Sequence, residues 1–179
     1  MSAGSLAEQT LRAGDLVLEP LTAQHAQAMF EAVADPALYR YIEARVPGSA
    51  EALRERYARL ESRASADGTQ QWLNWVVRPL GQAPVGYVQA TVIESNAWVA
   101  YVIGSAAQGK GYATRATRAM IDHLARTCRP RRFLACVEVA NEPSIRLLAR
   151  LDFRSATDAE TAVFPLSATE RLFVLEAAP

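Results

Sequence analysis

A glycine-rich segment with the residue types of a phosphate-binding loop lies near the middle of the chain: Gln108, Gly109, Lys110, Gly111, Tyr112, Ala113 and Thr114. Glycine has no Cβ, so backbone N–H groups beside Gly109 and Gly111 can approach a ligand closely. If a helix starts here, its free amides and partial positive charge also favour an anion. The segment therefore predicts binding of a phosphate group.

Two nucleotide-binding motifs match this segment in part, but neither matches it at every fixed position. Residues 104–110 fit the first seven positions of G-x-x-x-x-G-K-[ST], but the eighth is Gly111, so the hydroxyl that would hold Mg²⁺ is missing. The motif G-x-G-x-x-G fails because residue 114 is threonine. The flanking order also disagrees, since four residues join the apolar runs 85–93 and 98–104. Such a connection closes an antiparallel hairpin and cannot make a parallel crossover.

Hydrophobic periodicity places the glycine-rich segment between a strand and a helix. The pattern predicts strands over 16–20, 72–78, 85–93, 98–104, 132–139, 162–166 and 171–176, and helices over 22–34, 50–66, 113–127 and 143–151. The strand over 132–139 is reached through a helix, so we expect it to run parallel to the strand over 98–104. The expected architecture is α+β with three α/β/α layers, in which helices cover both faces of a mixed, mostly antiparallel sheet.

Length, charge and composition limit the expected domain organisation, partners and location. A chain of 179 residues is expected to form one domain over 15–179, preceded by a flexible lead-in over 1–14. Nineteen basic and nineteen acidic side chains cancel, which gives no reason to expect nucleic acid or membrane partners. Two cysteines and two histidines show no metal-ligand spacing. Without a long apolar run or a signal-like start, the expected location is the cytoplasm.

Three segments, taken in order, resemble the GNAT superfamily of N-acetyltransferases. Gln108, Gly111 and Ala113 occupy the fixed places of the Q/R-x-x-G-x-G/A signature. Residues 141–153 resemble the N-x-x-S-x-x-x-L-x-x-x-G-F segment of the subgroup that acetylates ribosomal-protein N termini, with aspartate at 152 in place of glycine. The opening from Leu16 is a weaker third match. Any one alone is weak, but their shared order and spacing make the set specific.

This resemblance implies a cosubstrate and a way of holding it. The cosubstrate is acetyl-CoA, with no metal, and residues 108–114 would wrap its pyrophosphate. In the family, the strands corresponding to 98–104 and 132–139 run parallel and then splay apart. The pantetheine arm would enter that split and hydrogen-bond to the backbone of Tyr101, Val102 and Ile103. Asn141 matches a residue that contacts the cofactor; its alternative role is a helix cap.

The resemblance also implies direct attack of an amine on the thioester. Ser144 matches the position that assists the leaving thiolate and contacts the cofactor; its alternative role is that of a first-turn helix serine. The glutamate common in the subgroup is replaced by Trp98, which cannot accept a proton. Glu138 is the best substitute by position, and Glu94 is the second candidate. A solvated or ion-paired strand residue is the alternative reading of Glu138.

The expected function is transfer of acetyl to a primary amine, on either a small molecule or a protein N terminus. The missing strand glutamate leaves a second hypothesis, an inactive acyl-CoA-binding regulatory or interaction module. The sequence does not identify the acceptor amine, and it allows a homodimer. Five further side chains are expected to have structural roles or simple electrostatic ones. Cys136 and Trp75 should lie in the core, and His123 should lie at the surface or cap a helix. Arg115 and Arg118 should either attract the phosphates of the ligand or be solvated.

Overall fold

The computed structural model describes residues 9–42, 44–164 and 166–177. Its centre is an eight-stranded sheet in the order β1-β2-β3-β4-β5-β6-β8-β7. The strands are β1 Leu11–Ala13, β2 Leu16–Pro20, β3 Gln70–Pro79, β4 Gly86–Ile93, β5 Asn96–Ile103, β6 Arg132–Glu138, β7 Arg154–Ser155 and β8 Glu170–Glu176. Neighbouring strands β5 and β6 run parallel, and the other neighbours run antiparallel. The expected mixed, mostly antiparallel sheet is confirmed.

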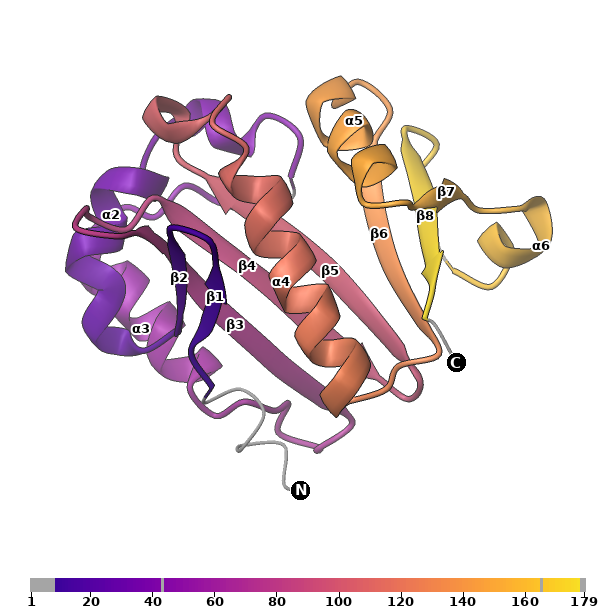
Figure 1. Cartoon of the computed structure of the whole chain (residues 1–179), viewed down its shortest axis with the longest axis horizontal. Coiled ribbons are helices and arrows are strands. Elements are labelled where there is room, and N and C mark those ends of the chain that lie inside the picture. The colour runs from indigo at the N-terminus through magenta and orange to yellow at the C-terminus, as the bar shows by residue number, and fades with distance from the viewer. Residues whose placement is uncertain (1–8, 43, 165, 178–179) are drawn as a thin grey trace.

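Helices cover both faces of this sheet (Figure 1). They are α2 Ala26–Val33, α3 Ala50–Leu60, α4 Tyr112–Thr127, α5 Glu142–Arg150 and α6 Asp158–Thr161, with short 3-10 helices η1 Ala23–His25, η2 Pro36–Tyr39 and η3 Ser105–Ala107. Strand β3 shows why two layers form. Its residues Trp75 and Val77 belong to the core beneath α4, whereas Val76 belongs to the core beneath α2 and α3. A strand that is apolar on both sides must be covered on both sides.

Helix α3 begins as the sequence predicts and ends earlier. The hydroxyl of Ser49 accepts a hydrogen bond from the amide of Ala52 at 3.1 Å, which caps the helix. The helix was expected to reach residue 66, but it ends at Leu60. Beyond it, the carboxylate of Asp67 accepts hydrogen bonds from the Ser65 hydroxyl at 2.5 Å and the Thr69 amide at 3.1 Å. These local bonds stabilise a turn in competition with the helix.

Two predictions near the chain ends were wrong. Residues 162–166 were expected to form a strand, but the described residues 162–164 form a turn that continues from α6, with amides bonded to the carbonyls of residues 158, 160 and 161, and β8 pairs with the short strand β7. Helix α6 itself begins with a capping box, in which the side chains of Thr157 and Glu160 each bond the backbone of the other. At the other end, residues 11–13 were expected to belong to a flexible lead-in, yet they form β1 and pair with β2.

The feature that positions the site is the divergence of β5 from β6. These strands pair at three positions, Asn96↔Arg132, Ala97↔Phe133 and Trp98↔Leu134. Beyond Trp98 no further β5–β6 pairing joins the two described strands, and Figure 1 shows them moving apart toward α5. The backbone of Tyr101, Val102 and Ile103 on the β6 side of β5 is therefore available to a ligand. The expected splayed parallel pair is confirmed.

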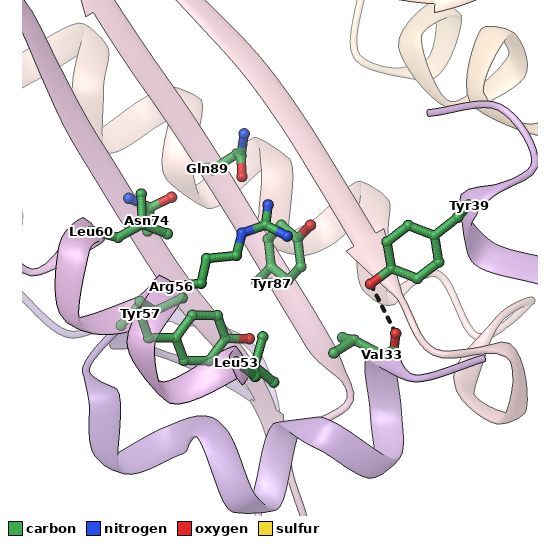
Figure 2. Close-up of a pocket in the computed structure, with 10 residues that line it drawn as sticks. Val33, Tyr39, Leu53, Arg56, Tyr57, Leu60, Asn74, Tyr87 and Gln89 are labelled. Atoms are coloured by element: carbon green, nitrogen blue, oxygen red, sulfur yellow. Dashed lines mark hydrogen bonds between the residues drawn. The ribbon is translucent and has the colours of Figure 1, made fainter. Parts of the chain in front are cut away.

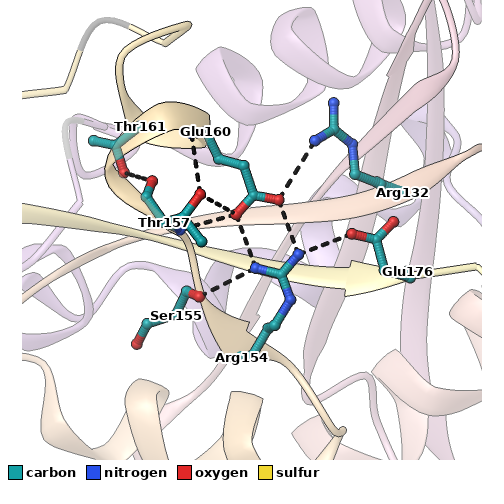
Figure 3. Close-up of polar contacts among 7 residues, drawn as sticks. All are labelled: Arg132, Arg154, Ser155, Thr157, Glu160, Thr161 and Glu176. Atoms are coloured by element: carbon teal, nitrogen blue, oxygen red, sulfur yellow. Dashed lines mark hydrogen bonds and ion pairs between the residues drawn. The ribbon is translucent and has the colours of Figure 1, made fainter.

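A charged network fastens the last part of the chain (Figure 3). The two terminal nitrogens of Arg154 donate to Glu160 at 2.8 Å each, and one of them also donates to Glu176 at 2.9 Å. Arg132 forms an ion pair with Glu160 at 3.6 Å. Glu160 thus links α6 to β6 and β7. Hydrogen bonds from Arg154 and from the Thr157 backbone lower the pKa of Glu160 to about 2.

We expect Glu160→Gln to lose more stability, relative to the wild type, at neutral pH than in acid. The pKa of Glu160 is lower in the folded protein than its ordinary value of 4.5, so its contribution is present above pH 4.5 and is lost as the pH falls toward 2. Urea unfolding at pH 7 and pH 3 measures this difference. Glu142→Gln, which removes the exposed Glu142–Arg146 pair, is the control. An equal loss for Glu160→Gln at both pH values would contradict the assignment.

Candidate active site

The glycine-rich loop presents backbone amides at the start of α4. Gly109 and Gly111 lie in the left-handed region, at φ +77° and +73°, where other residues are strained. The side-chain amide of Gln108 donates to the carbonyl of Ile103 at 3.0 Å and so fixes the loop to the end of β5. The first helical hydrogen bond runs from Arg115 to Gly111 at 3.1 Å. The amides of residues 112–114 therefore face out of the helix start, a geometry that suits an anion.

The basic residues around the loop have different roles. Arg115 forms an ion pair with Asp15, in the turn between β1 and β2. Arg118 donates to Asp152 at 2.9 Å and to the carbonyl of residue 150 at 3.0 Å, which ties α4 to the end of α5. The guanidinium of Arg115 also lies 5.5 Å from the centre of the Tyr112 ring, which belongs to the loop. Both arginines therefore make structural contacts, and that of Arg115 reaches the loop. Lys110 lies exposed within the loop and is the only lysine in the sequence.

The segment that joins β5 to the glycine-rich loop is held against the end of α2. The hydroxyl of Ser105 donates a hydrogen bond to the carboxylate of Asp35, and the same carboxylate accepts from the amide of Ala37 at 2.9 Å. A Cβ on Gly104 would lie 2.6 Å from the carbonyl oxygen of Ala32, so this close approach requires glycine. The glycine-rich loop and the segment that follows α2 are therefore packed as one unit.

A pair of hydroxyl groups spans the split between β5 and α5. The phenol of Tyr101 and the hydroxyl of Ser144 lie 2.6 Å apart. Burial raises the pKa of Tyr101 to about 12, although the hydrogen bond with Ser144 opposes the rise. Tyr101 is therefore protonated at neutral pH and can donate. Only the backbone of Tyr101 was predicted to take part, yet strand alternation places its side chain on the same face as Val99 and Ile103, which packs under α4 and α5.

Asn141 caps α5 in the structure. Its side-chain oxygen accepts a hydrogen bond from the amide of Ser144 at 3.2 Å. The alternative reading of Asn141 thus describes what the structure contains, and the cap also fixes the backbone that presents Ser144. Contact of Asn141 with the cofactor stays a prediction. At the other end of α5, Asp152 adopts φ +66°, as expected for the position that holds glycine in the resembled subgroup.

A pocket of about 350 Å³ lies beside the split on the other face of the sheet. We call it the acceptor-side pocket; it is lined by Arg40, Tyr41, Ile42, Cys136, Glu138 and Glu170. Glu138 and Glu170 stand opposite each other on β6 and β8. Glu138 also accepts a hydrogen bond from the hydroxyl of Thr169 at 3.1 Å. The two carboxylates give this pocket a chemistry that suits a cationic amine.

Three expectations about single residues need correction. Cys136 is exposed in the acceptor-side pocket because β6 alternates, with Ala135 and Val137 on the side packed by α4. His123 is buried, with its ring edge-on to Trp75 at 5.9 Å. Glu94 lies in the β4–β5 turn, seven residues before Tyr101 along an extended strand, which corresponds to roughly 20 Å. Glu94 is therefore far from the split, and Glu138 is the better candidate. Trp75 lies in the core as expected.

The described part of the chain contains neither a metal-ligand group nor a membrane-length helix. Within it, no group of three or more histidine, cysteine, aspartate or glutamate side chains is placed to hold a metal ion. Among its helices, none is long and apolar enough to cross a membrane.

Many solved structures have a similar fold, and three of them are acetyltransferases from Vibrio fischeri, Salmonella typhimurium and Vibrio cholerae. Ribosomal-protein-S5-alanine acetyltransferase from Vibrio fischeri is 19% identical with a TM-score of 0.76, covering 94% of this chain and 97% of its own. The acetyl transferase that modifies the N-terminal serine of a 50S ribosomal subunit protein in Salmonella typhimurium is 18% identical, with a TM-score of 0.74 and coverages of 95% and 100%. Spermidine N-acetyltransferase from Vibrio cholerae, in complex with CoA and spermine, is 16% identical, with a TM-score of 0.70 and coverages of 91% and 96%. At such identities the likeness shows the fold.

Comparison of sequences gives information beyond the fold. Among curated proteins, no relative matches the sequence. The family model described as an acetyltransferase (GNAT) domain, however, matches residues 15–154. This range contains the glycine-rich loop, the split and the Tyr101–Ser144 pair. The chain therefore belongs to the GNAT acetyltransferase family.

Proposed function

We propose that this protein transfers the acetyl group of acetyl-CoA directly to a primary amine. One observation carries the proposal: the free amides of the loop at 109–114 adjoin the unpaired edge of β5. A diphosphate on the loop would place the attached pantetheine arm along Tyr101, Val102 and Ile103. These remain the candidate cofactor contacts, together with Gln108, Lys110 and the other loop residues. The Vibrio cholerae neighbour, whose structure contains CoA, supports the choice of ligand.

The proposed reaction needs three contributions from the chain. The neutral amine attacks the thioester carbon, and the backbone N–H groups of β5 stabilise the oxyanion that forms. Collapse of the tetrahedral species breaks the carbon–sulfur bond. The Tyr101–Ser144 hydroxyl pair then donates a hydrogen bond to the departing thiolate. The nitrogen loses a proton and the sulfur gains one, so the products are the N-acetylated acceptor and CoA.

Glu138 is the proposed acceptor of the proton from the amine. It lies in the acceptor-side pocket at the open part of β6, and Glu170 opposite it adds a second negative charge for an incoming ammonium. The backbone amide of Ser167 and the Cys136 thiol hold the pKa of Glu170 below its ordinary value, so Glu170 stays ionised at neutral pH. An amine entering this pocket can bind as the cation and give its proton to Glu138, directly or through a water.

The proposed acceptors are a small amine or a protein N terminus. The Salmonella neighbour modifies an N-terminal serine and the Vibrio cholerae neighbour is a spermidine acetyltransferase, which supports both classes. The proposal also includes a location in the cytoplasm, a single domain and the ability to form a homodimer. The inactive-module hypothesis rested on Trp98 in place of the strand glutamate. The position of Glu138 beside the split favours the enzyme.

Thiol release from acetyl-CoA with a panel of amines and N-terminal peptides tests the function. We expect at least one acceptor to release CoA, with N-acetylation verified by mass spectrometry. Glu138→Gln should lower kcat/KM by about 10- to 100-fold at neutral pH, and the deficit should shrink as the pH rises because more amine is then neutral. Glu31→Gln, an exposed change on α2, is the control. CoA binding without release by any acceptor would favour the inactive module.

The chemical reactivity of Lys110 reports directly on whether CoA occupies the glycine-rich loop. Because it is the only lysine in the sequence, an amine-specific reagent reports on this one side chain and on the chain's α-amine. We expect saturating CoA to slow reductive methylation of Lys110 several-fold, since the diphosphate would bind beside it. The α-amine serves as the internal reference in the same mass spectrum. Equal rates for Lys110 with and without CoA would remove it from the binding loop.

A further inference from the structure

A second, smaller cavity lies between α2, α3 and the sheet (Figure 2). We call it the Arg56 pocket; its polar lining consists of Tyr39, Arg56, Tyr57, Asn74, Tyr87 and Gln89. Helix α3 supplies Arg56 and Tyr57, whereas Asn74 belongs to β3, and Tyr87 and Gln89 to β4. Figure 2 shows Arg56 reaching across the cavity toward Tyr87 and Gln89. None of these residues has a place in the reaction proposed above.

Two side chains of this pocket each bury one polar atom that has no hydrogen-bond partner among the described residues. Tyr57 is 2% exposed and Asn74 is 4% exposed. The hydroxyl of Tyr57 and the side-chain nitrogen of Asn74 make no hydrogen bond with any described group. The hydroxyl of Tyr39, in contrast, donates to the carbonyl of Val33 at 2.8 Å. Burying a polar group without a partner costs free energy, which a ligand that supplies the partner would recover.

The charge of the pocket is positive and uncompensated among the described residues. Arg56 is the one ionic side chain in the lining, and no described carboxylate forms an ion pair with it. Burial raises the pKa of Tyr87, and the hydrogen bond with Arg56 partly opposes that rise. The phenols thus stay neutral and can donate. A guanidinium, phenols and a side-chain amide together form a set of donors, which suits an anion.

The size of the cavity favours a carboxylate over a phosphate. The enclosed volume is about 10 Å³, roughly the space for one oxygen-sized group. A carboxylate has two oxygens in a plane, so one can enter between Tyr57 and Asn74 while the other remains on Arg56 at the half-exposed mouth. A phosphate would bring further oxygens and a second negative charge, for which the pocket offers neither space nor a second cation.

The Arg56 pocket adjoins the acceptor-side pocket through the segment after α2. Tyr39 lines the first pocket, and the next three residues, Arg40 to Ile42, line the second. Gln89 of the first pocket pairs with Ala100, which is exposed in the middle of β5, next to the split. One molecule lying along this segment can therefore reach both pockets.

We infer that the acceptor carries a carboxylate, and that Arg56, Tyr57 and Asn74 bind it while the amine lies near Glu138. This inference rests on the proposed function and narrows its substrate class. The favoured acceptors are peptides with an acidic residue close to the N terminus or small amines that also carry a carboxylate. Arg56 would then determine specificity without touching the reacting atoms.

Matched acceptor pairs test this inference. The pairs are alanine against alaninamide, Ala-Glu-amide against Ala-Gln-amide, and Ala-Ala-Glu-amide against Ala-Ala-Gln-amide, which move the carboxylate stepwise from the amine. We expect the acid to exceed its neutral partner in kcat/KM in at least one pair, by about 10- to 100-fold for a charged hydrogen bond in a half-buried site. Arg56→Gln should remove that preference, Arg56→Lys should keep part of it, and CoA affinity should be unchanged in both.

Arg59→Gln provides the matched control, because Arg59 lies exposed on the same helix and outside the pocket. It should keep the wild-type preference for the acid. Calorimetry of the best acid with the CoA-bound protein adds a reading independent of turnover, and its binding heat should weaken only in the Arg56 variants. Equal rates for acid and amide in every pair, or a preference that survives Arg56→Gln, would overturn the inference. Failure to acetylate any amine would instead contradict the proposed function.

Discussion

Replacing Gly111 by valine is expected to weaken CoA binding by more than about 100-fold, because at least two charged hydrogen bonds from the loop to the diphosphate are lost. Gly111 adopts φ +73°, which costs an L-residue about 1–2 kcal/mol, and more when the side chain is β-branched. Apart from Gly111 itself, its chain neighbours and the adjacent helix backbone, no atom of the described residues lies within 4 Å of a Cβ built at this position. The effect therefore comes from altered backbone and from the space that the ligand needs. Thermal melts with acetyl-CoA measure it as loss of the ligand-induced shift.

Gly68 offers a matched control for backbone strain. It has φ +72°, again with nothing within 4 Å of a Cβ, and it lies in the turn before β3. Gly68→Val should lower the melting temperature of the free protein about as much as Gly111→Val, while keeping the full shift with acetyl-CoA. A normal shift in Gly111→Val would remove the loop from the binding site. An equal loss of shift in both variants would mean that the strain acts globally.

The second large effect is expected at the Tyr101–Ser144 pair. Ser144→Ala and Tyr101→Phe should each lower kcat by about 10- to 100-fold with little change in acetyl-CoA affinity, because the hydroxyl pair acts on the departing thiolate. The double variant should be no slower than the slower single variant, since two groups that act as a unit are not additive. Single-turnover thiol release separates this chemical step from binding.

The control for a structural role is Ser49→Ala. Ser49 also lies at a helix start and bonds the backbone there, so its loss should cost about 1 kcal/mol of stability without affecting kcat. If Ser144→Ala behaves in the same way, its role is that of a helix residue. Strictly multiplicative losses in the Tyr101 and Ser144 variants would show that the two hydroxyls act separately.

The sequence alone was sufficient for features that depend on local order. The short connection between the strands predicted over 85–93 and 98–104, followed by a helical crossover, predicted one parallel pair within a mostly antiparallel sheet. In the structure this connection has two residues, 94 and 95, and β5 pairs in parallel with β6. The position of the glycines predicted a turn between a strand and a helix, and Gly109 and Gly111 lie between β5 and α4, both in the left-handed region. These predictions held because turn geometry and hydrophobic periodicity act over a few residues.

Features that depend on strand register and on packing between several elements were harder to predict from the sequence. Cys136 was read as a core residue because its neighbours are apolar, yet β6 turns it to the face that borders the acceptor-side pocket. The Tyr101–Ser144 contact joins residues 43 positions apart and depends on how far the strands diverge. The strand expected over 162–166 was wrong because the amides of residues 162–164 bond to carbonyls of α6, a helix that the sequence analysis did not include. The Arg56 pocket brings together two helices and two strands, which no single motif records.

The central claim is that the amides at 109–114 bind the diphosphate of CoA. The most direct test is isothermal titration calorimetry of the purified protein with CoA and, separately, with pantetheine, which lacks the diphosphate. We predict a saturable binding heat for CoA with a Kd in the micromolar range, and none for pantetheine at the same concentrations. The absence of heat with millimolar CoA, or equal affinity for pantetheine, would contradict the claim.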